Sequence, residues 1–275
     1  MAPIIDVIRH AEATHNVTGG SVWERDPELT TDGEAQAGQL GRSYPYTSLI
    51  YHVVCSPMRR AVKTALIAFE DHVSGTPAIL LPELQETGVH PSDHGQSRQA
   101  LLKLFRPQVD VNELDDKWNY KGQGSKYEPD VPLVEARARE ARVFLRRLAR
   151  KAPDDAHIVV VSHGGFLHFL TNDFAGLSEE YFTSYRNTGM RSFEFADLHG
   201  DDVEAKLVET RESCLKSGLG FYALLSEEEK AELKSYAVRR VLAQKGEFDR
   251  MTAPDRPPMC VCVDKMVLKR NMYNR

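Results

Sequence analysis

Long hydrophobic runs are missing from this 275-residue chain. No stretch approaches the roughly 18 consecutive apolar residues that indicate a membrane-spanning helix. The N-terminal segment MAPIIDVIRHAE also carries charge too early to contain the apolar region of a secretory signal. We therefore expect a cytoplasmic protein that has no membrane partner.

Cysteine is scarce as well. The four cysteines, at positions 55, 214, 260 and 262, do not show the spacing of a disulfide framework. The pair Cys260 and Cys262 has neither a second cysteine pair nor a nearby histidine that would complete a metal or redox site. We expect reduced, structural thiols.

An excess of positive charge is also missing. The chain has 35 Lys and Arg residues against 40 Asp and Glu residues, for a formal net charge of -5 at pH 7. Binding to a phosphate backbone requires concentrated Lys and Arg, so we expect no nucleic-acid partner. The arginine-rich helix predicted from Leu133 to about Lys151 also contains Glu135 and Glu140, which indicates a solvated helix face rather than a nucleic-acid patch.

The composition is that of a globular protein, with 41% hydrophobic and 27% charged residues. Segments typical of strands alternate with segments typical of helices, which predicts an α/β fold with a mostly parallel sheet, helices on both faces and an antiparallel edge. The predicted parallel strands are Ile4–Arg9, Tyr51–Cys55, Ala78–Leu81 and His157–Ser162, and the antiparallel pair is Arg191–Asp197 and Val203–Val208. A capping box that begins at Thr31 predicts a helix from Glu34 to about Arg42.

One large domain accounts for most of this pattern. We expect residues 1–210 to form it, with a less regular insertion at 88–132 that acts as a lid. Residues 211–275 are expected to be a C-terminal helix and a tail packed on the same domain. Ser226 is the predicted cap of that helix, which should run to about Gln244.

Polar side chains follow four of the predicted parallel strands. Arg9 and His10 end the first strand, and Arg60 follows the second. Glu86 follows the third strand and His163 follows the fourth. Because ligands bind beyond the carboxyl ends of such strands, we expect these side chains to face one crevice.

Phosphoryl transfer is the chemistry that this set suits. The planar fork of arginine matches phosphate oxygens, and helix N-termini after Arg60 and His163 add backbone N–H groups. A neutral imidazole such as His10 attacks phosphorus directly, and nearby arginines disfavour its protonation. A carboxylic acid such as Glu86 protonates the leaving alcohol.

The segment Arg9-His10-Ala11-Glu12-Ala13-Thr14-His15-Asn16 resembles the Arg-His-Gly-Glu-x-x-x-Asn signature of the histidine phosphatase superfamily, also called phosphoglycerate mutase-like. Further matching blocks follow in the order of that family: LTTDGEAQA at 29–37, SPMRRAVKTA at 56–65, ELQE at 83–86 and SHGG at 162–165. The resemblance spans about residues 4–198 and implies a phosphoglycerate mutase-like three-layer sandwich.

The resemblance also implies roles for the site residues. His10 would be the nucleophile and Glu86 the proton donor. The phosphoryl group would be held by Arg9, Asn16, Arg60 and His163. No metal and no other cofactor is implied.

The chain departs from the family pattern at Ala11, which replaces the usual glycine. This Arg-His-Ala (RHA) form resembles that of a eukaryotic, largely fungal branch. The segment from Glu86 to Gly95 resembles the acid-bearing loop of that branch, and Asp93 is a second candidate for the proton donor. The sequence does not decide between Glu86 and Asp93.

The leading hypothesis is therefore a hydrolase of phosphomonoesters that acts on a small phosphorylated metabolite through a phosphohistidine. Three alternatives stay open: a phosphomutase, a tailoring enzyme that uses the same pocket on a non-phosphorylated metabolite, and a non-catalytic phosphate-binding scaffold. The identity of the substrate and the formation of a homodimer are also left open.

Overall fold

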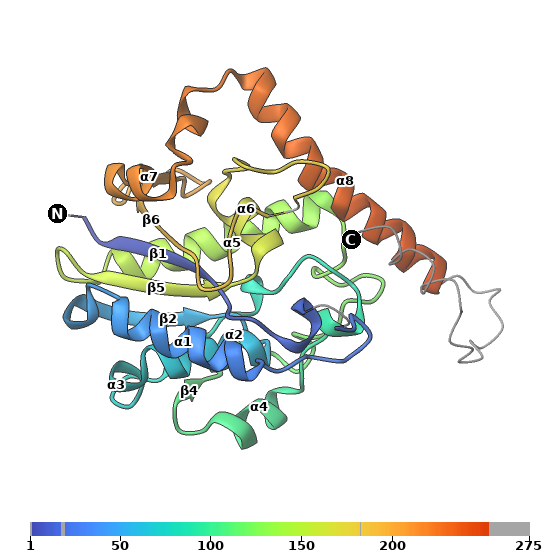
Figure 1. Cartoon of the computed structure of the whole chain (residues 1–275), viewed down its shortest axis with the longest axis horizontal. Helices are drawn as coiled ribbons and strands as arrows, with labels where there is room; N and C mark the ends of the chain where they lie inside the picture. The colour runs from blue at the N-terminus through green and yellow to red at the C-terminus, as the bar shows by residue number, and fades with distance from the viewer. Residues whose placement is uncertain (1, 18–19, 182, 253–275) are drawn as a thin grey trace.

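The computed structural model describes residues 2–17, 20–181 and 183–252, and a seven-stranded sheet forms its centre (Figure 1). The strands lie in the order β4-β3-β2-β5-β1-β6-β7. The first five are parallel to one another, whereas β6 is antiparallel to both of its neighbours, β1 and β7. The predicted α/β fold with an antiparallel edge is thus confirmed. The strands are β1 (Ile4–Arg9), β2 (Ile50–Cys55), β3 (Ala78–Leu80), β4 (Val109–Asp110), β5 (His157–Ser162), β6 (Met190–Phe195) and β7 (Leu207–Glu209).

Helices cover both faces of the sheet. Ile158 and Val160 of β5 pack in one apolar cluster with α5 and α6, while Val159 and Val161 pack in a second cluster with α1 and α2. This alternation explains why all six residues of β5 are buried. The α-helices are α1 (Thr31–Ser43), α2 (Arg59–Ala68), α3 (Glu70–Val73), α4 (Arg98–Phe105), α5 (Val131–Ala149), α6 (Gly164–Thr171), α7 (Arg211–Ser217) and α8 (Glu227–Thr252).

Several predicted boundaries need correction. Helix α1 begins at Thr31 and not at Glu34, because the hydroxyl of Thr30 caps it by accepting a hydrogen bond from the Gly33 N–H at 2.9 Å. The last helix does not end near Gln244 but continues to Thr252. The remaining tail, with Cys260 and Cys262, lies outside the described residues.

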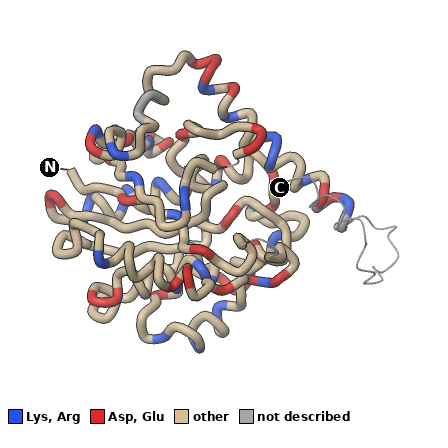
Figure 2. Tube along the Cα trace, in the orientation of Figure 1, with Lys and Arg blue, Asp and Glu red and all other residues tan. Residues whose placement is uncertain are grey.

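The predicted solvated face of α5 is correct for Arg139 and Arg147, which are exposed, but not for its other arginines. Arg137, Arg142 and Arg146 are buried, and their guanidinium groups donate to backbone carbonyls of neighbouring segments. Basic and acidic residues are interspersed along the chain trace (Figure 2). Sequence periodicity missed this burial because a long arginine side chain buries its stem and carries its polar head to a distant acceptor.

The register of the central strands positions their carboxyl ends. Arg9 at the end of β1 pairs with Ser162 at the end of β5, and Cys55 at the end of β2 pairs with Val161. The backbone N–H of His10 then donates to the Ser162 carbonyl at 2.9 Å. The residues that follow β1, β2 and β5 therefore meet at one edge of the sheet.

A buried ion cluster supports the antiparallel side of the sheet. Arg191 of β6 pairs with Glu209, with 2.9 Å between Arg191 Nε and Glu209 Oε1, and also pairs with Asp173. Arg191 is 4% exposed. Its loss would leave two carboxylates without their counter-charge.

We predict that Arg191→Met lowers the free energy of unfolding by about 3–5 kcal/mol, because breaking a buried ion pair leaves uncompensated charge. Urea denaturation followed by circular dichroism measures this change. The control is Lys216→Met, which removes a pair with Glu212 whose two side chains are exposed, and it should shift the midpoint little. Equal shifts for the two variants would contradict the structural role of the cluster.

Candidate active site

His10 directly follows β1 and is 3% exposed. Its Nδ1 lies 2.7 Å from the carbonyl oxygen of Ala11, so Nδ1 carries the proton and donates it. The other ring nitrogen, Nε2, accepts from Arg60 Nε at 3.3 Å. Burial, and then the charges of Arg60 and Arg9, lower the pKa of His10 well below 6.5. The ring is therefore neutral, with its lone pair on Nε2.

Three contacts position the backbone at His10. One is the strand-like bond from the His10 N–H to Ser162. In a second, Thr64 Oγ1 accepts from the Ala11 N–H at 3.0 Å, and in the third, Asn187 Nδ2 donates to the His10 carbonyl at 2.9 Å. Sequence reasoning missed Asn187. The topology offers a signal for it, because a residue just before antiparallel β6 lies at the carboxyl end of β1.

The ring of His163 lies beside that of His10, with 5.1 Å between the centroids. Its Nε2 is 2.8 Å from the Ser56 hydroxyl, and its buried Nδ1 has no hydrogen-bond partner among the described residues. Burial, followed by the charge of Arg60, lowers the pKa of His163 well below 6.5. His163 is thus a second neutral imidazole with one ring nitrogen available.

Two arginines complete a cluster that we call the His–Arg cluster: Arg9, His10, Arg60 and His163. Besides its contact with His10, Arg60 donates to the Ser92 carbonyl at 2.7 Å and approaches Asp93 Oδ1 at 3.4 Å. Arg9 donates to the Tyr185 carbonyl at 2.9 Å, while its buried Nε has no hydrogen-bond partner within the part of the chain that the structure describes. A backbone carbonyl thus orients each guanidinium group, and Arg60 also forms an ion pair with Asp93.

Glu86 lies against the N-terminus of α6. One carboxylate oxygen accepts from the Thr87 N–H at 2.8 Å and the other from the Gly165 N–H at 3.1 Å. A Cβ on Gly165 would sit 2.7 Å from this carboxylate, so the contact requires glycine there. Burial raises the pKa of Glu86, but the Thr87 N–H, the Arg240 charge and further donors outweigh burial and lower the pKa overall.

The loop that carries Glu86 is held through its backbone. Lys121, from the predicted insertion, donates to the carbonyls of Glu86 and Gly88, each at 2.8 Å. Arg137 of α5 donates to the Gln85 carbonyl at 2.5 Å. Burial lowers the pKa of Lys121 to about 7. No motif in the sequence pointed to these two cations, because each acts on backbone atoms.

Asn16 takes part in none of the contacts described above. Its side-chain oxygen accepts from the Ala13 N–H at 3.1 Å, which caps a turn, and its Nδ2 faces His15 Nε2 at 3.2 Å. The ring centroids of His15 and His10 are 6.0 Å apart. Burial, followed by the charge of Arg60, lowers the pKa of His15 to about 3. The predicted role of Asn16 in holding phosphate stays a prediction.

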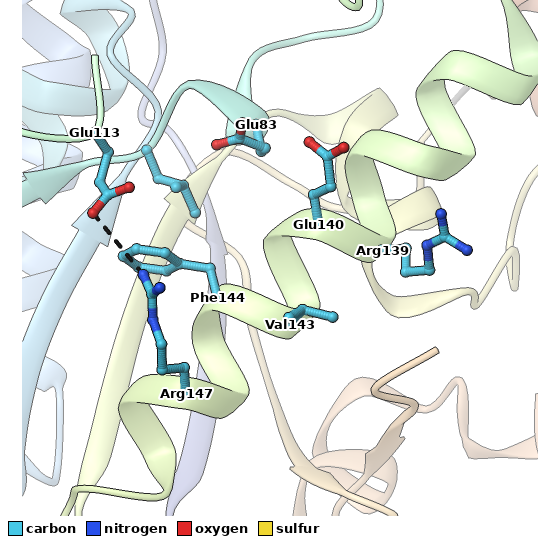
Figure 3. A pocket seen from close by; sticks show the side chains of 8 residues that line it. Glu83, Glu113, Arg139, Glu140, Val143, Phe144 and Arg147 are labelled. Carbon is cyan, nitrogen blue, oxygen red and sulfur yellow. Dashed lines mark ion pairs between the residues drawn. The ribbon is translucent and has the colours of Figure 1, made fainter. Parts of the chain in front are cut away.

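A surface hollow beside α5 is a poor alternative site. Glu83, Glu113 and Glu140 line it together with Arg139 and Arg147 (Figure 3). Arg147 is paired with Glu113 at 4.0 Å. Three carboxylates repel a phosphate dianion, and the hollow contains no histidine.

Two features are absent from the described residues, which omit 1, 18–19, 182 and 253–275. No group of three or more His, Cys, Asp or Glu side chains there is arranged to hold a metal ion. Within the same residues, every helix is too short or too polar to cross a membrane.

The chain belongs to the histidine phosphatase superfamily (branch 1), whose family model matches residues 5–207. A probable phosphatase of Schizosaccharomyces pombe is 29% identical over 161 residues, which are 57% of this chain and 72% of that protein. A phosphoglycerate mutase-like protein of Arabidopsis thaliana is 28% identical over an alignment of 235 residues that covers 70% of this chain and 84% of that protein. The solved structure of mycobacterial hydrolase 1 is 20% identical and has a TM-score of 0.49, covering 76% of this chain and 97% of the other.

Because His10 and His163 are buried and neutral, we expect the folded protein to lose stability as the pH falls. Below pH 6.5 the unfolded chain binds a proton at His10 that the folded protein cannot, so stability falls as pH falls. Between pH 7.5 and 5.5, each such histidine should lower the free energy of unfolding by an amount on the order of 1 kcal/mol. We predict that His10→Asn loses less stability than wild type over this range, measured by denaturant unfolding at both pH values.

The control for this experiment is His199→Gln, at an exposed position. It should lose as much stability between pH 7.5 and 5.5 as wild type. A His10→Asn variant with the same pH dependence as wild type would show that the His10 ring is protonated in the folded protein.

Proposed function

We propose that this protein hydrolyses phosphomonoesters of small metabolites through a phosphohistidine on Nε2 of His10. One observation carries the proposal: the Ala11 carbonyl holds the proton on Nδ1, which leaves a neutral Nε2 lone pair beside Arg60. A lone pair in this position is a nucleophile, and guanidinium groups stabilise the charge on the phosphoryl oxygens.

In the first step, Nε2 of His10 forms a bond to phosphorus and the bond from phosphorus to the ester oxygen breaks. The leaving oxygen takes a proton from a carboxylic acid and departs as an alcohol. Arg9, Arg60 and His163 hold the phosphoryl oxygens. With the Ser56 hydroxyl donating to Nε2 of His163, the Nδ1 proton of that ring is available to the phosphoryl group.

In the second step, water attacks phosphorus and the phosphohistidine bond breaks. The carboxylate that donated a proton in the first step now takes one from the water. The products are an alcohol and inorganic phosphate, and His10 returns to its neutral state. This sequence of steps needs no metal and no other cofactor.

We assign the role of acid to Glu86. Its lowered pKa means that the carboxylate is ionised in the free protein, so it must gain a proton when substrate binds. A phosphoryl group brings negative charge beside Glu86 and raises its pKa. Asp93 is the rival donor, and its Oδ1 lies 3.4 Å from Arg60 Nη2.

We prefer hydrolysis to the alternatives because of the name given to a similar protein. The yeast relative is named a probable phosphatase. A mutase, a tailoring enzyme for non-phosphorylated metabolites and a non-catalytic scaffold remain the competing hypotheses. We further assign the chain to the RHA-type, largely fungal branch on the basis of Ala11, with Asn16 as an additional phosphate ligand and the cytoplasm as its compartment.

The nucleophile assignment predicts that His10→Asn lowers turnover of p-nitrophenyl phosphate by about three orders of magnitude or more. It should also abolish the acid-labile, base-stable label that wild type acquires from a radiolabelled phosphate ester. The control is His15→Asn, which changes the neighbouring imidazole and should keep the label. A label that survives in His10→Asn would place the intermediate on another residue.

The acid assignment predicts that Glu86→Gln slows alkyl phosphates by about 10²- to 10⁴-fold but slows p-nitrophenyl phosphate far less. A poor leaving alcohol must be protonated as it departs, whereas nitrophenolate need not be. The comparison is Asp93→Asn, on the same loop, with kcat measured for both esters. A leaving-group effect that appears only in Asp93→Asn would move the acid to Asp93.

A further inference from the structure

The acid-bearing loop, which comprises residues 86–95, is held at its far end by the segment 118–121 of the predicted insertion. The Asn119 side-chain amide donates to the Gly95 carbonyl at 3.0 Å. Trp118 is fully buried, and its indole packs so closely on Gly95 that a Cβ there would overlap it. This segment of the insertion is therefore bound directly to the loop.

Lys121, at the end of the same segment, holds the other end of the loop. Its side chain is almost entirely buried, and its ammonium group donates to the carbonyls of Glu86 and Gly88, each at 2.8 Å. These two carbonyls flank Thr87, so one side chain fixes the backbone on both sides of that residue. Lys121 thus sets the position of the backbone from which the Glu86 side chain extends.

Two backbone N–H groups hold the Glu86 carboxylate itself. They belong to Thr87, at 2.8 Å, and to Gly165, at 3.1 Å. Gly165 is the second residue of α6, a position at which the N–H has no acceptor within the helix. A displaced backbone at Glu86 would carry the carboxylate away from α6 and break this contact. The amides of Thr87 and Gly165 therefore report the position of the carboxylate.

We propose that Lys121 is a positioning residue for the reaction: it holds the carbonyls of Glu86 and Gly88 and thereby keeps the Glu86 carboxyl where it protonates the leaving alcohol. The inference rests on the proposed function, in which Glu86 is the acid. Lys121 acts through the loop backbone and not on the substrate. Its hold on the loop affects the rate because a displacement of about 1 Å in a catalytic group costs on the order of 10²-fold.

The test measures kcat/KM of Lys121→Met for ethyl phosphate and for p-nitrophenyl phosphate. Only the alkyl ester needs a well-placed acid, so the ratio of kcat/KM for p-nitrophenyl phosphate to that for ethyl phosphate should rise by about 10- to 100-fold over wild type. A lower fraction of folded enzyme reduces both values equally and leaves the ratio unchanged. An unchanged ratio would overturn the proposal.

The matched control is Lys117→Met, which removes an exposed lysine four residues earlier and should keep the ratio. If Lys121→Met does not fold, Lys121→Gln takes its place; it keeps an N–H donor on a shorter side chain and should raise the ratio less.

A double variant tests whether Lys121 acts through Glu86. Adding Lys121→Met to Glu86→Gln should leave the ratio where Glu86→Gln alone puts it, because the carboxyl that Lys121 positions is already gone. A ratio that rises by the product of the two single effects would show that Lys121 acts elsewhere and would overturn the proposal.

Amide hydrogen exchange separates the positioning from turnover. Without substrate, the Thr87 and Gly165 amides should exchange about 10-fold faster or more in Lys121→Met than in wild type, and as in wild type in Lys117→Met. If the exchange rates rise in this way but wild type hydrolyses neither ester, the proposed hydrolysis is wrong and the hold of Lys121 on the loop stands. If wild type hydrolyses both esters and Lys121→Met changes neither the ratio nor the exchange rates, the role of Lys121 is wrong and the hydrolysis stands.

Discussion

The parallel pairing of β1 with β5 is the constraint on which the site depends. The register places Arg9 opposite Ser162, and the bond from the His10 N–H to Ser162 extends that register beyond the end of β1. The 5.1 Å between the rings of His10 and His163 follows from it. A shift by one residue would turn every side chain of β1 to the opposite face of the sheet and separate the two rings.

The site also depends on how its positive charge is held. Arg9 and Arg60 donate to the carbonyls of Tyr185 and Ser92, and Lys121 donates to those of Glu86 and Gly88. Carbonyls orient a cation without cancelling its charge, so the charges of Arg9 and Arg60, which add to the effect of burial in keeping His10 neutral, also attract an anion. The backbone carbonyls thus hold these basic side chains in fixed positions and leave the electrostatic field of the site positive.

The sequence predicted four of the five parallel strands and the polar residues that follow them, because short buried runs and strand ends are visible in one dimension. It did not predict β4, since two residues are too few to show a pattern. Arg137 and Lys121 were also missed, because their partners are backbone carbonyls that only the tertiary fold brings near.

The position of β1 in the sheet has a consequence for synthesis of the chain. β1 is made first, yet its two partners, β5 and β6, begin only at residues 157 and 190. A nascent chain shorter than about 190 residues therefore carries the apolar segment IIDVIR with at least one edge unpaired, and such edges promote aggregation. The centre of this sheet therefore forms late during synthesis on the ribosome. Until it forms, chaperones need to shield the emerging N-terminal half.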